Sequence, residues 1–421
     1  MALPRSSRPF DPSRRRLAAG GLAAAAWSWL AAPGLAGAQP AAPAGGNRKG
    51  SCPAVTWPLW QAFASHYLQA DGRIVDYSVP QMHSTSEGQS YGMFFALVAN
   101  DPAAFERIWR WSVLNLAGGN LSARLPAWQW GRREDGNWGV LDPNAASDAD
   151  LWFAYALLEA ARIWKKPQYR DEASVLLARV QRDEVVNLPG LGQMLLPGPQ
   201  GFNLPGGVWR LNASYLMVPQ LRRFATEDPS GPWAAIARNS LRVLAESPGK
   251  GYVADWIGYQ VSGSSGGRFI VDPGKGSVGS YDAIRSYLWA GVTSAADPLF
   301  ADSLKALDGM RAALVTSGGL PPEKVDVTTG QTTGTGPLGF SAVLLPYLDA
   351  LGESALYNTQ MRRVLSMLPA ANVTAANIPV YYDMVLSLFA LGWTDGRYRF
   401  LQDCLLYTSP GPRDVEESRM P

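Results

Sequence analysis

The stretch STSEGQSYGMFFAL, residues 84–97, places one acidic side chain, Glu87, just before an apolar run. Small and hydroxyl-bearing residues surround the acid, and the run from Met93 to Leu97 is typical of a buried helix. An acid in a first helical turn can simply complement the helix dipole. It can also do chemistry at the mouth of a buried helix, and the rest of the chain decides between the two interpretations.

Helical spacing of apolar residues continues along most of the chain and predicts twelve helices. Several connections between them are short, which favours antiparallel neighbours. Six such pairs predict an all-α fold, an (α/α)6 barrel of six helical hairpins, with a carboxylate-lined cleft at the N-terminal ends of the inner helices. The expected helices cover residues 57–69, 87–100, 103–117, 148–164, 167–184, 212–225, 232–246, 281–293, 298–315, 339–350, 353–367 and 380–391.

Acidic residues stand at the start of several of the expected inner helices. If these helices run parallel, Glu87, Asp148 and Asp282 meet at one rim together with several tyrosines. Helix capping is the competing explanation, and we assign it to Ser147 and Asp150, whose spacing fits a capping box. For the other three acids we favour a shared groove, because a cap needs no aromatic-rich loops around it.

Tryptophan is abundant and often falls in expected loops. The chain has 16 Trp and 16 Tyr. The faces of Trp rings stack on the apolar faces of sugar rings, and the indole N–H can bond a hydroxyl. Beside the carboxylates, the following residues predict a sugar-binding cleft: Trp128, Trp130, Trp138, Trp209 and Trp256.

A glycine motif at residues 274–279, GKGSVG, fits the dinucleotide pattern G-x-G-x-x-G and follows a strand-like segment, 268–272. A dinucleotide site also requires a parallel βαβ unit around the motif. The chain shows no alternation of strands and helices, so we interpret these glycines as a flexible approach to Asp282.

The composition excludes several classes of function. The chain has 421 residues, 47% of them hydrophobic, which allows a sizeable core. Residues 1–38 carry a net charge of +4 and the remainder carries −2, so no electrostatic attraction to nucleic acid is expected. Two cysteines and two histidines offer no metal-ligand spacing, and we expect no metal and no cofactor.

The N-terminus is typical of an export signal. The basic segment SRRRL, residues 13–17, is similar to a twin-arginine signal, and AGA, residues 36–38, fits a cleavage site. The apolar stretch between them, 17–30, is too short to span a bilayer, although it could form a short anchor. We predict a signal peptide over 1–38, a flexible leader over 39–50, and a periplasmic or secreted protein without stable membrane insertion.

Six separate motifs carry a family resemblance. The chain resembles glycoside hydrolase family 8 and, within it, members encoded with bacterial cellulose synthases. One position of the family signature that is usually Ile or Met is Phe153, which changes only packing. The similar segments, between Cys52 and Phe400, are TSEGQSYGM (85–93), LPAWQWG (125–131), ASDAD (146–150), NASY (212–215), SYDAIR (280–285) and PPEKVD (321–326).

The resemblance implies a catalytic domain over residues 51–400 that cleaves β-1,4-glucan internally, with inversion. It implies Glu87 as general acid, Asp282 as general base and Asp148 as a ligand of the sugar at the cleavage subsite. Tyr215 would help to position the attacking water. The other substrate-binding residues expected are Tyr91, Trp128, Trp130, Trp209, Tyr281 and Arg285, the last of which would pair near the base.

To act as general acid, Glu87 must be protonated when substrate binds. The start of its helix favours the anion. A neighbouring Asp148 charge and burial by substrate both oppose this effect, so we predict a pKa of Glu87 above its ordinary value.

Two other functions remain open. One is a xylanase, chitosanase or mixed-linkage glucanase of the same family. The other is a non-catalytic glucan-binding subunit, which would keep the tryptophans and could lose the acids. The partners expected are a β-1,4-glucan and the cellulose synthase export machinery. Residues 401–421 depart from the family and show no periodicity, so we expect a disordered or foreign tail, which leaves a Cys52–Cys404 disulfide open.

Overall fold

The computed structural model describes residues 56–368 and 378–401. The expected signal peptide and leader, both cysteines and the tail from residue 402 onward lie outside these residues.

Helices make up most of the described chain, close to the boundaries expected from apolar spacing. They are α1 (Pro58–Tyr67), α2 (Ser86–Val98), α3 (Pro102–Asn115), α4 (Ser147–Trp164), α5 (Pro167–Asp183), α6 (Val218–Glu227), α7 (Trp233–Glu246), α8 (Ile284–Val292), α9 (Phe300–Ala306), α10 (Gly309–Thr316), α11 (Leu338–Ala350), α12 (Ser354–Met367) and α13 (Tyr381–Thr394).

Three expected helices differ from the observed ones. The helix expected over 212–225 is divided into a 3-10 turn, η1 (Ala213–Tyr215), and α6, because Pro219 fits only the first turn of a helix. The helix expected over 298–315 is divided into α9 and α10. The helix expected over 281–293 begins three residues later than expected, at Ile284, so Asp282 lies in the turn before α8.

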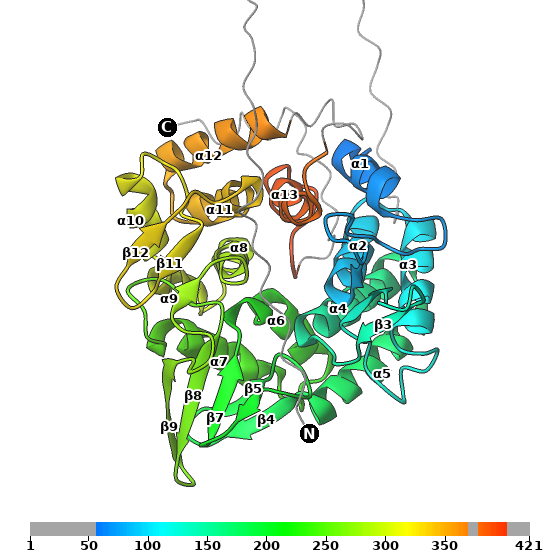
Figure 1. Cartoon of the computed structure of the whole chain (residues 1–421), viewed down its shortest axis with the longest axis horizontal. Coiled ribbons are helices and arrows are strands. Elements are labelled where there is room, and N and C mark those ends of the chain that lie inside the picture. Colours follow the sequence, from blue (N-terminus) through cyan, green and yellow to red (C-terminus); the bar gives the residue numbers. More distant parts are fainter. Residues whose placement is uncertain (1–55, 369–377, 402–421) are drawn as a thin grey trace, which may run out of the picture. The chain divides into compact units, whose positions relative to one another are not determined.

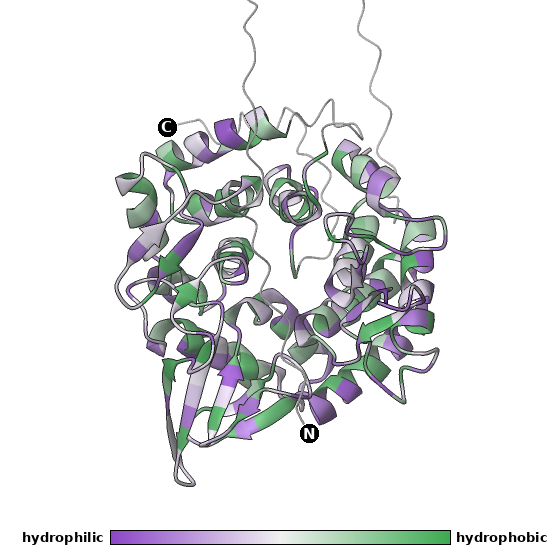
Figure 2. Cartoon of the chain, in the orientation of Figure 1, coloured by the Kyte–Doolittle hydropathy of each residue, from purple (hydrophilic) through white to green (hydrophobic). Residues whose placement is uncertain are grey.

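The helices separate into two groups by burial. Helices α2, α4, α8, α11 and α13 are buried along nearly their whole length, whereas α3, α5, α7 and α12 bury one face only. Figure 2 shows the outer helices with mixed hydrophilic and hydrophobic faces. Every second expected helix is therefore an inner one, as predicted, with only α6 less completely buried.

The inner helices contact one another in chain order (Figure 1). Helix α2 packs on α4, α4 on α6, α8 on α11, α11 on α13, and α13 returns to α2. Turn η1 contacts both α4 and α8 and so completes the circuit. Aromatic rings fill the space between these helices, with Phe389 lying 5.0 Å from Trp152 and 5.4 Å from Trp289, measured between ring centroids.

Short strands, which the all-α expectation did not include, occupy the connections between the described helices. They form four antiparallel sheets, with the orders β1-β2-β3, β4-β5, β6-β7-β8-β9 and β10-β11-β12. Their bounds are β1 (Ser84–Thr85), β2 (Gln129–Arg132), β3 (Trp138–Asp142), β4 (Val185–Leu188), β5 (Gly192–Leu195), β6 (Asn203–Leu204), β7 (Val208–Leu211), β8 (Ile257–Ser262), β9 (Gly266–Val271), β10 (Val278–Gly279), β11 (Lys324–Asp326) and β12 (Gln331–Thr333).

The glycine motif follows β9, which pairs antiparallel with β8. No parallel βαβ unit surrounds the motif in the described sheets, so a dinucleotide site of that type is excluded there. The Asp272 carboxylate accepts the N–H groups of Gly274 and Lys275 and also pairs with Arg210. The expected flexible approach is therefore a turn closed by hydrogen bonds.

None of the helices within residues 56–368 and 378–401 combines the length and the apolar character needed to cross a bilayer.

Close contact between α8 and α11 depends on Gly291. A Cβ at this position would lie 2.4 Å from the backbone N of Tyr347 and 2.5 Å from the carbonyl carbon of Pro346. Alanine is favoured over glycine in a helix by about 1 kcal/mol. Overpacking against a backbone that cannot swing away costs about 1–3 kcal/mol, so the clash outweighs the propensity.

We therefore predict that Gly291→Ala lowers the melting temperature in a thermal unfolding experiment. Ala178→Gly, on the exposed face of α5, calibrates the helix-propensity contribution alone. A Gly291→Ala protein that is as stable as the parent, or more stable, would show that the two helices do not approach so closely.

Candidate active site

Three carboxylates come together at the N-terminal ends of inner helices. Glu87 lies in the first turn of α2, Asp148 in the first turn of α4, and Asp282 in the turn before α8. Two of them, Asp148 and Asp282, are joined by the guanidinium of Arg285.

Arg285, in the first turn of α8, is the centre of this group. Its Nη1 donates to Asp148 Oδ2 at 2.9 Å and to the Tyr91 hydroxyl oxygen at 2.8 Å. Its Nη2 donates to Asp282 Oδ1 at 2.7 Å, and its guanidinium carbon lies 5.6 Å from the centroid of the Tyr215 ring. Because the Arg285 side chain is buried, water competes little for these hydrogen bonds.

Asp148 is almost completely buried and has fixed partners for both oxygens. Its Oδ1 accepts the N–H of Ala149 at 2.9 Å, and its Oδ2 also accepts the Tyr91 hydroxyl at 3.2 Å. Burial raises the pKa of Asp148, and the positive charge of Arg285 opposes that rise.

Glu87 does not cap its helix, because Thr85 fills that position. The Thr85 hydroxyl accepts the N–H of Gly88 at 3.1 Å. Glu87 is half-buried and accepts hydrogen bonds from the indole N–H of Trp128 and the hydroxyl of Ser86, both at 3.2 Å. A backbone hydrogen bond from Ser86 N–H to Trp128 O, 2.9 Å long, fixes the tryptophan beside the acid.

The electrostatic surroundings of Glu87 favour its protonated form. Burial and the neighbouring Asp148 carboxylate raise the pKa of Glu87 to about 8. Arg285 acts in the opposite direction but does not outweigh them. The pKa of Glu87 therefore lies above its ordinary value, in the direction expected from the sequence.

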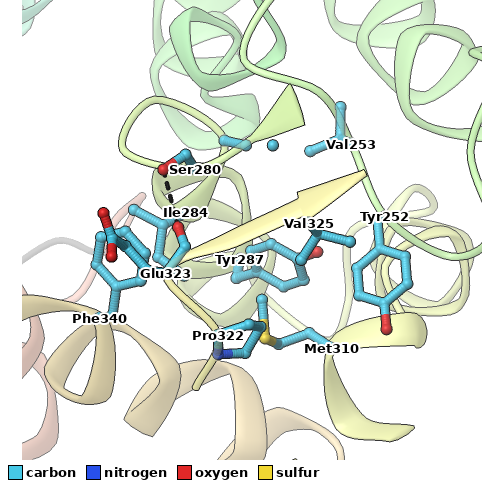
Figure 3. Close-up of a pocket in the computed structure, with 12 residues that line it drawn as sticks. Tyr252, Val253, Ser280, Ile284, Tyr287, Met310, Pro322, Glu323, Val325 and Phe340 are labelled. Carbon is cyan, nitrogen blue, oxygen red and sulfur yellow. Dashed lines mark hydrogen bonds between the residues drawn. The ribbon is translucent and has the colours of Figure 1, made fainter. Parts of the chain in front are cut away.

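The turn that carries Asp282 is held from both sides. On one side, the Asp255 carboxylate accepts backbone N–H groups of the turn, among them that of Asp282 at 3.2 Å. On the other side, the Ser280 hydroxyl donates to the carbonyl oxygen of Glu323 at 2.8 Å (Figure 3). Sequence reasoning did not single out Asp255, because it lies 27 residues before Asp282 with no motif linking the two segments.

The capping box expected at Ser147 and Asp150 is wrong. Ala146 occupies the cap position of α4, and the N–H of Ser147 donates to the carbonyl oxygen of Pro197, outside the helix. Both Asp150 oxygens are buried, and no described residue provides them with a hydrogen-bond partner. Burial, with the nearby charges of Asp148 and Glu87, raises the pKa of Asp150 well above its ordinary value.

Of the five tryptophans expected to line a sugar-binding cleft, all of which the structure describes, only Trp128 hydrogen-bonds to a carboxylate of the group, and it is 37% exposed. Trp256 stacks on Phe202. The Trp130 ring stacks on Trp138, with the Arg73 guanidinium 4.5 Å from its centroid. Trp209 lies on β7, half-buried against the core.

The remaining expected residues are the tyrosines. Tyr91 is buried, and its hydroxyl donates to Asp148 and accepts from Arg285, while its ring packs against Trp152. It therefore holds Asp148 in place. Tyr281 is directed toward Glu323, to which its hydroxyl donates at 3.3 Å.

Metal binding finds no support in the described part of the chain. There, no group of three or more His, Cys, Asp or Glu side chains is placed to hold an ion.

The comparison with known proteins agrees with this geometry. The model of glycosyl hydrolases family 8 matches residues 50–396. The chain belongs to glycosyl hydrolase family 8. Two proteins named endoglucanase are similar to it. The one from Pseudomonas fluorescens (strain SBW25) is 49% identical, and the match covers 82% of this chain and 89% of the relative. The one from Xanthomonas axonopodis pv. citri (strain 306) is 50% identical, and the match covers 82% of this chain and 88% of the relative.

A solved structure in family 8 also matches. The endo-1,4-D-glucanase from Vibrio fischeri ES114 superposes with a TM-score of 0.77 and 40% sequence identity, over 84% of this chain and 99% of that protein. Membership of family 8 therefore rests on both sequence and structure.

The pKa of Glu87 can be tested directly. We expect NMR of carboxyl-¹³C-labelled glutamate, with Glu87→Gln to identify the signal, to give a pKa near 8 for Glu87. Replacing Asp148 by Asn removes a negative charge, so the pKa of Glu87 should fall. A pKa near the ordinary value of about 4.3, or no fall in Asp148→Asn, would contradict the electrostatic account.

Proposed function

We propose that this chain is an endo-acting glycoside hydrolase that cleaves β-1,4-glucosidic bonds in cellulose with inversion at the anomeric carbon. The observation that carries the proposal is one acid kept protonated, Glu87, in the same group as a carboxylate held by an arginine, Asp282. The names of the similar proteins, endoglucanase and endo-1,4-D-glucanase, support a β-1,4-glucan as substrate.

The mechanism follows from the needs of glycosidic bond cleavage. Glu87 gives its proton to the leaving oxygen as the bond to the anomeric carbon breaks. Asp282 takes a proton from the water that attacks the opposite face of the ring. Asp148, fixed by Tyr91 and Arg285, would bond the hydroxyls of the sugar whose bond is cleaved. Its negative charge also keeps the proton on Glu87 until that proton is needed.

The architecture suits this reaction. We infer that the inner and outer helices form an (α/α)6 barrel, with the substrate cleft at the N-terminal ends of α2, α4 and α8. The circuit of contacts among the inner helices and the acids at these three starts support the inference. Trp128, exposed beside Glu87, would stack on a sugar ring at the cleavage point.

The cellular setting follows from the N-terminal sequence. We infer export to the periplasm or beyond through the signal peptide predicted over residues 1–38, and action on glucan made by a cellulose synthase. Detection of the mature chain, beginning at Gln39, in a periplasmic or culture fraction would test the export route.

The roles of the acids can be tested on carboxymethyl cellulose. We predict that Glu87→Gln and Asp282→Asn each lower the rate of viscosity loss by at least about 10²-fold, because each removes one half of general acid–base catalysis. Glu172→Gln is the matched control, since Glu172 also accepts an indole N–H, that of Trp109, but on the outer helices.

If either variant folds normally and hydrolyses carboxymethyl cellulose at the wild-type rate, the residue it replaces has no catalytic role. Xylan and chitosan are assayed in parallel with the wild-type enzyme. Faster hydrolysis of either one would overturn the assignment of β-1,4-glucan.

A further inference from the structure

In the proposed mechanism the base is Asp282, which lies in the turn before α8. The carbonyl oxygens of Ser280 and Asp282 accept the N–H groups of Ile284 and Arg285, but the N–H groups of the turn itself need partners outside the helix. Residues 280–283 precede α8, and Ala283, at the cap position, provides no side-chain cap. The direction of the Asp282 carboxylate therefore depends on what fixes the backbone of this turn, as well as on its hydrogen bond with Arg285.

Asp255 supplies the missing cap from a distant segment. One oxygen of its carboxylate, Oδ1, accepts the N–H of Ser280 at 2.7 Å, that of Ala283 at 2.8 Å and that of Asp282 at 3.2 Å. Asp255 is itself held in place, because its own N–H donates to the carbonyl oxygen of Val278 in β10 at 2.9 Å. A single oxygen thus gathers three of the N–H groups at the start of α8.

Two further hydrogen bonds hold the turn from its other side. Ser280 donates to the Glu323 carbonyl, and the Tyr382 hydroxyl donates to the carbonyl oxygen of Tyr281 at 2.6 Å. Behind the turn, Figure 3 shows a pocket lined mainly by apolar side chains, among them Tyr252, Tyr287 and Met310. Its volume is about 10 Å³, too small for a sugar ring.

We propose that Asp255 is a positioning residue for catalysis, which acts by fixing the turn that aims the Asp282 carboxylate at the attacking water. The proposal rests on the proposed function of Asp282 as general base. Asp255 need not touch the substrate, because its effect passes through the three backbone N–H groups. What the turn requires is an acceptor oxygen at this place rather than a negative charge. Burial and the nearby Asp282 charge favour the neutral form of Asp255 by raising its pKa to about 7.

The test compares kcat and KM on a soluble cello-oligosaccharide such as cellohexaose. Asp255→Ala should lower kcat by about 10²-fold with little change in KM, because a base displaced by about 1 Å loses that much. Asp255→Asn keeps the acceptor oxygen and should restore most of the rate. Asp101→Ala is the matched control, since the Asp101 carboxylate also caps a helix, accepting the N–H of Ala104 at 2.9 Å at the start of the outer helix α3.

A kcat of Asp255→Ala close to that of Asp101→Ala would overturn the proposal. So would an Asp255→Asn protein as slow as Asp255→Ala. Should Asp255→Ala fail to fold, Asp255→Glu takes its place. The glutamate keeps the carboxyl group but is longer by one methylene, which displaces the acceptor oxygen, so the same loss of kcat is expected. A wild-type kcat would overturn the proposal.

The double variant Asp255→Ala with Asp282→Asn separates this inference from the proposed function. If Asp255 acts through Asp282, removing Asp255 lowers the residual rate of Asp282→Asn no further. An equal loss in both backgrounds would refute the positioning role while Asp282 remained the base. An active Asp282→Asn single variant would instead refute the proposed function.

Discussion

The site depends on one buried cation. Arg285 joins Asp148, from α4, to Asp282, in the turn before α8, and it also holds the Tyr91 hydroxyl of α2. Asp148 is buried and Asp282 is partly exposed, and two carboxylates that share one guanidinium would otherwise repel each other. Removing one partner of a buried ion pair typically costs about 3–5 kcal/mol, because the remaining charge is left uncompensated. The same guanidinium therefore stabilises the convergence of three inner helices and sets the direction of two acids.

The charges around Arg285 explain how similar acids can perform opposite tasks. Glu87 has no hydrogen bond to the arginine among its described partners, and it faces the negative charge of Asp148, so it keeps its proton. Asp282 shares the arginine, and in the proposed mechanism it accepts the proton of the attacking water. The helix dipole at the start of α2 favours an anion by only about 0.3–1 kcal/mol, which burial and the Asp148 charge outweigh.

Much of this arrangement could be predicted from the sequence, since apolar runs of helical period located the inner helices and the acids at their starts. The short strands could not be predicted, because segments of two to six residues carry too little alternation to be recognised. The capping box failed for a tertiary reason, since the N–H of Ser147 bonds the distant Pro197 carbonyl. Asp255 was missed for the same kind of reason, because only the folded chain brings it beneath the Asp282 turn.

The stereochemistry of hydrolysis is the decisive measurement, because it reports whether water attacks the ring face opposite the leaving group, as a base at Asp282 requires. The wild-type enzyme is mixed with a cello-oligosaccharide in an NMR tube, and the anomeric proton of the first product is recorded before mutarotation. The account predicts the α-anomer, the outcome of a single displacement on a β-linked glucan. The β-anomer as first product would mean a covalent intermediate and a carboxylate acting as nucleophile, which would contradict the roles assigned to Glu87 and Asp282.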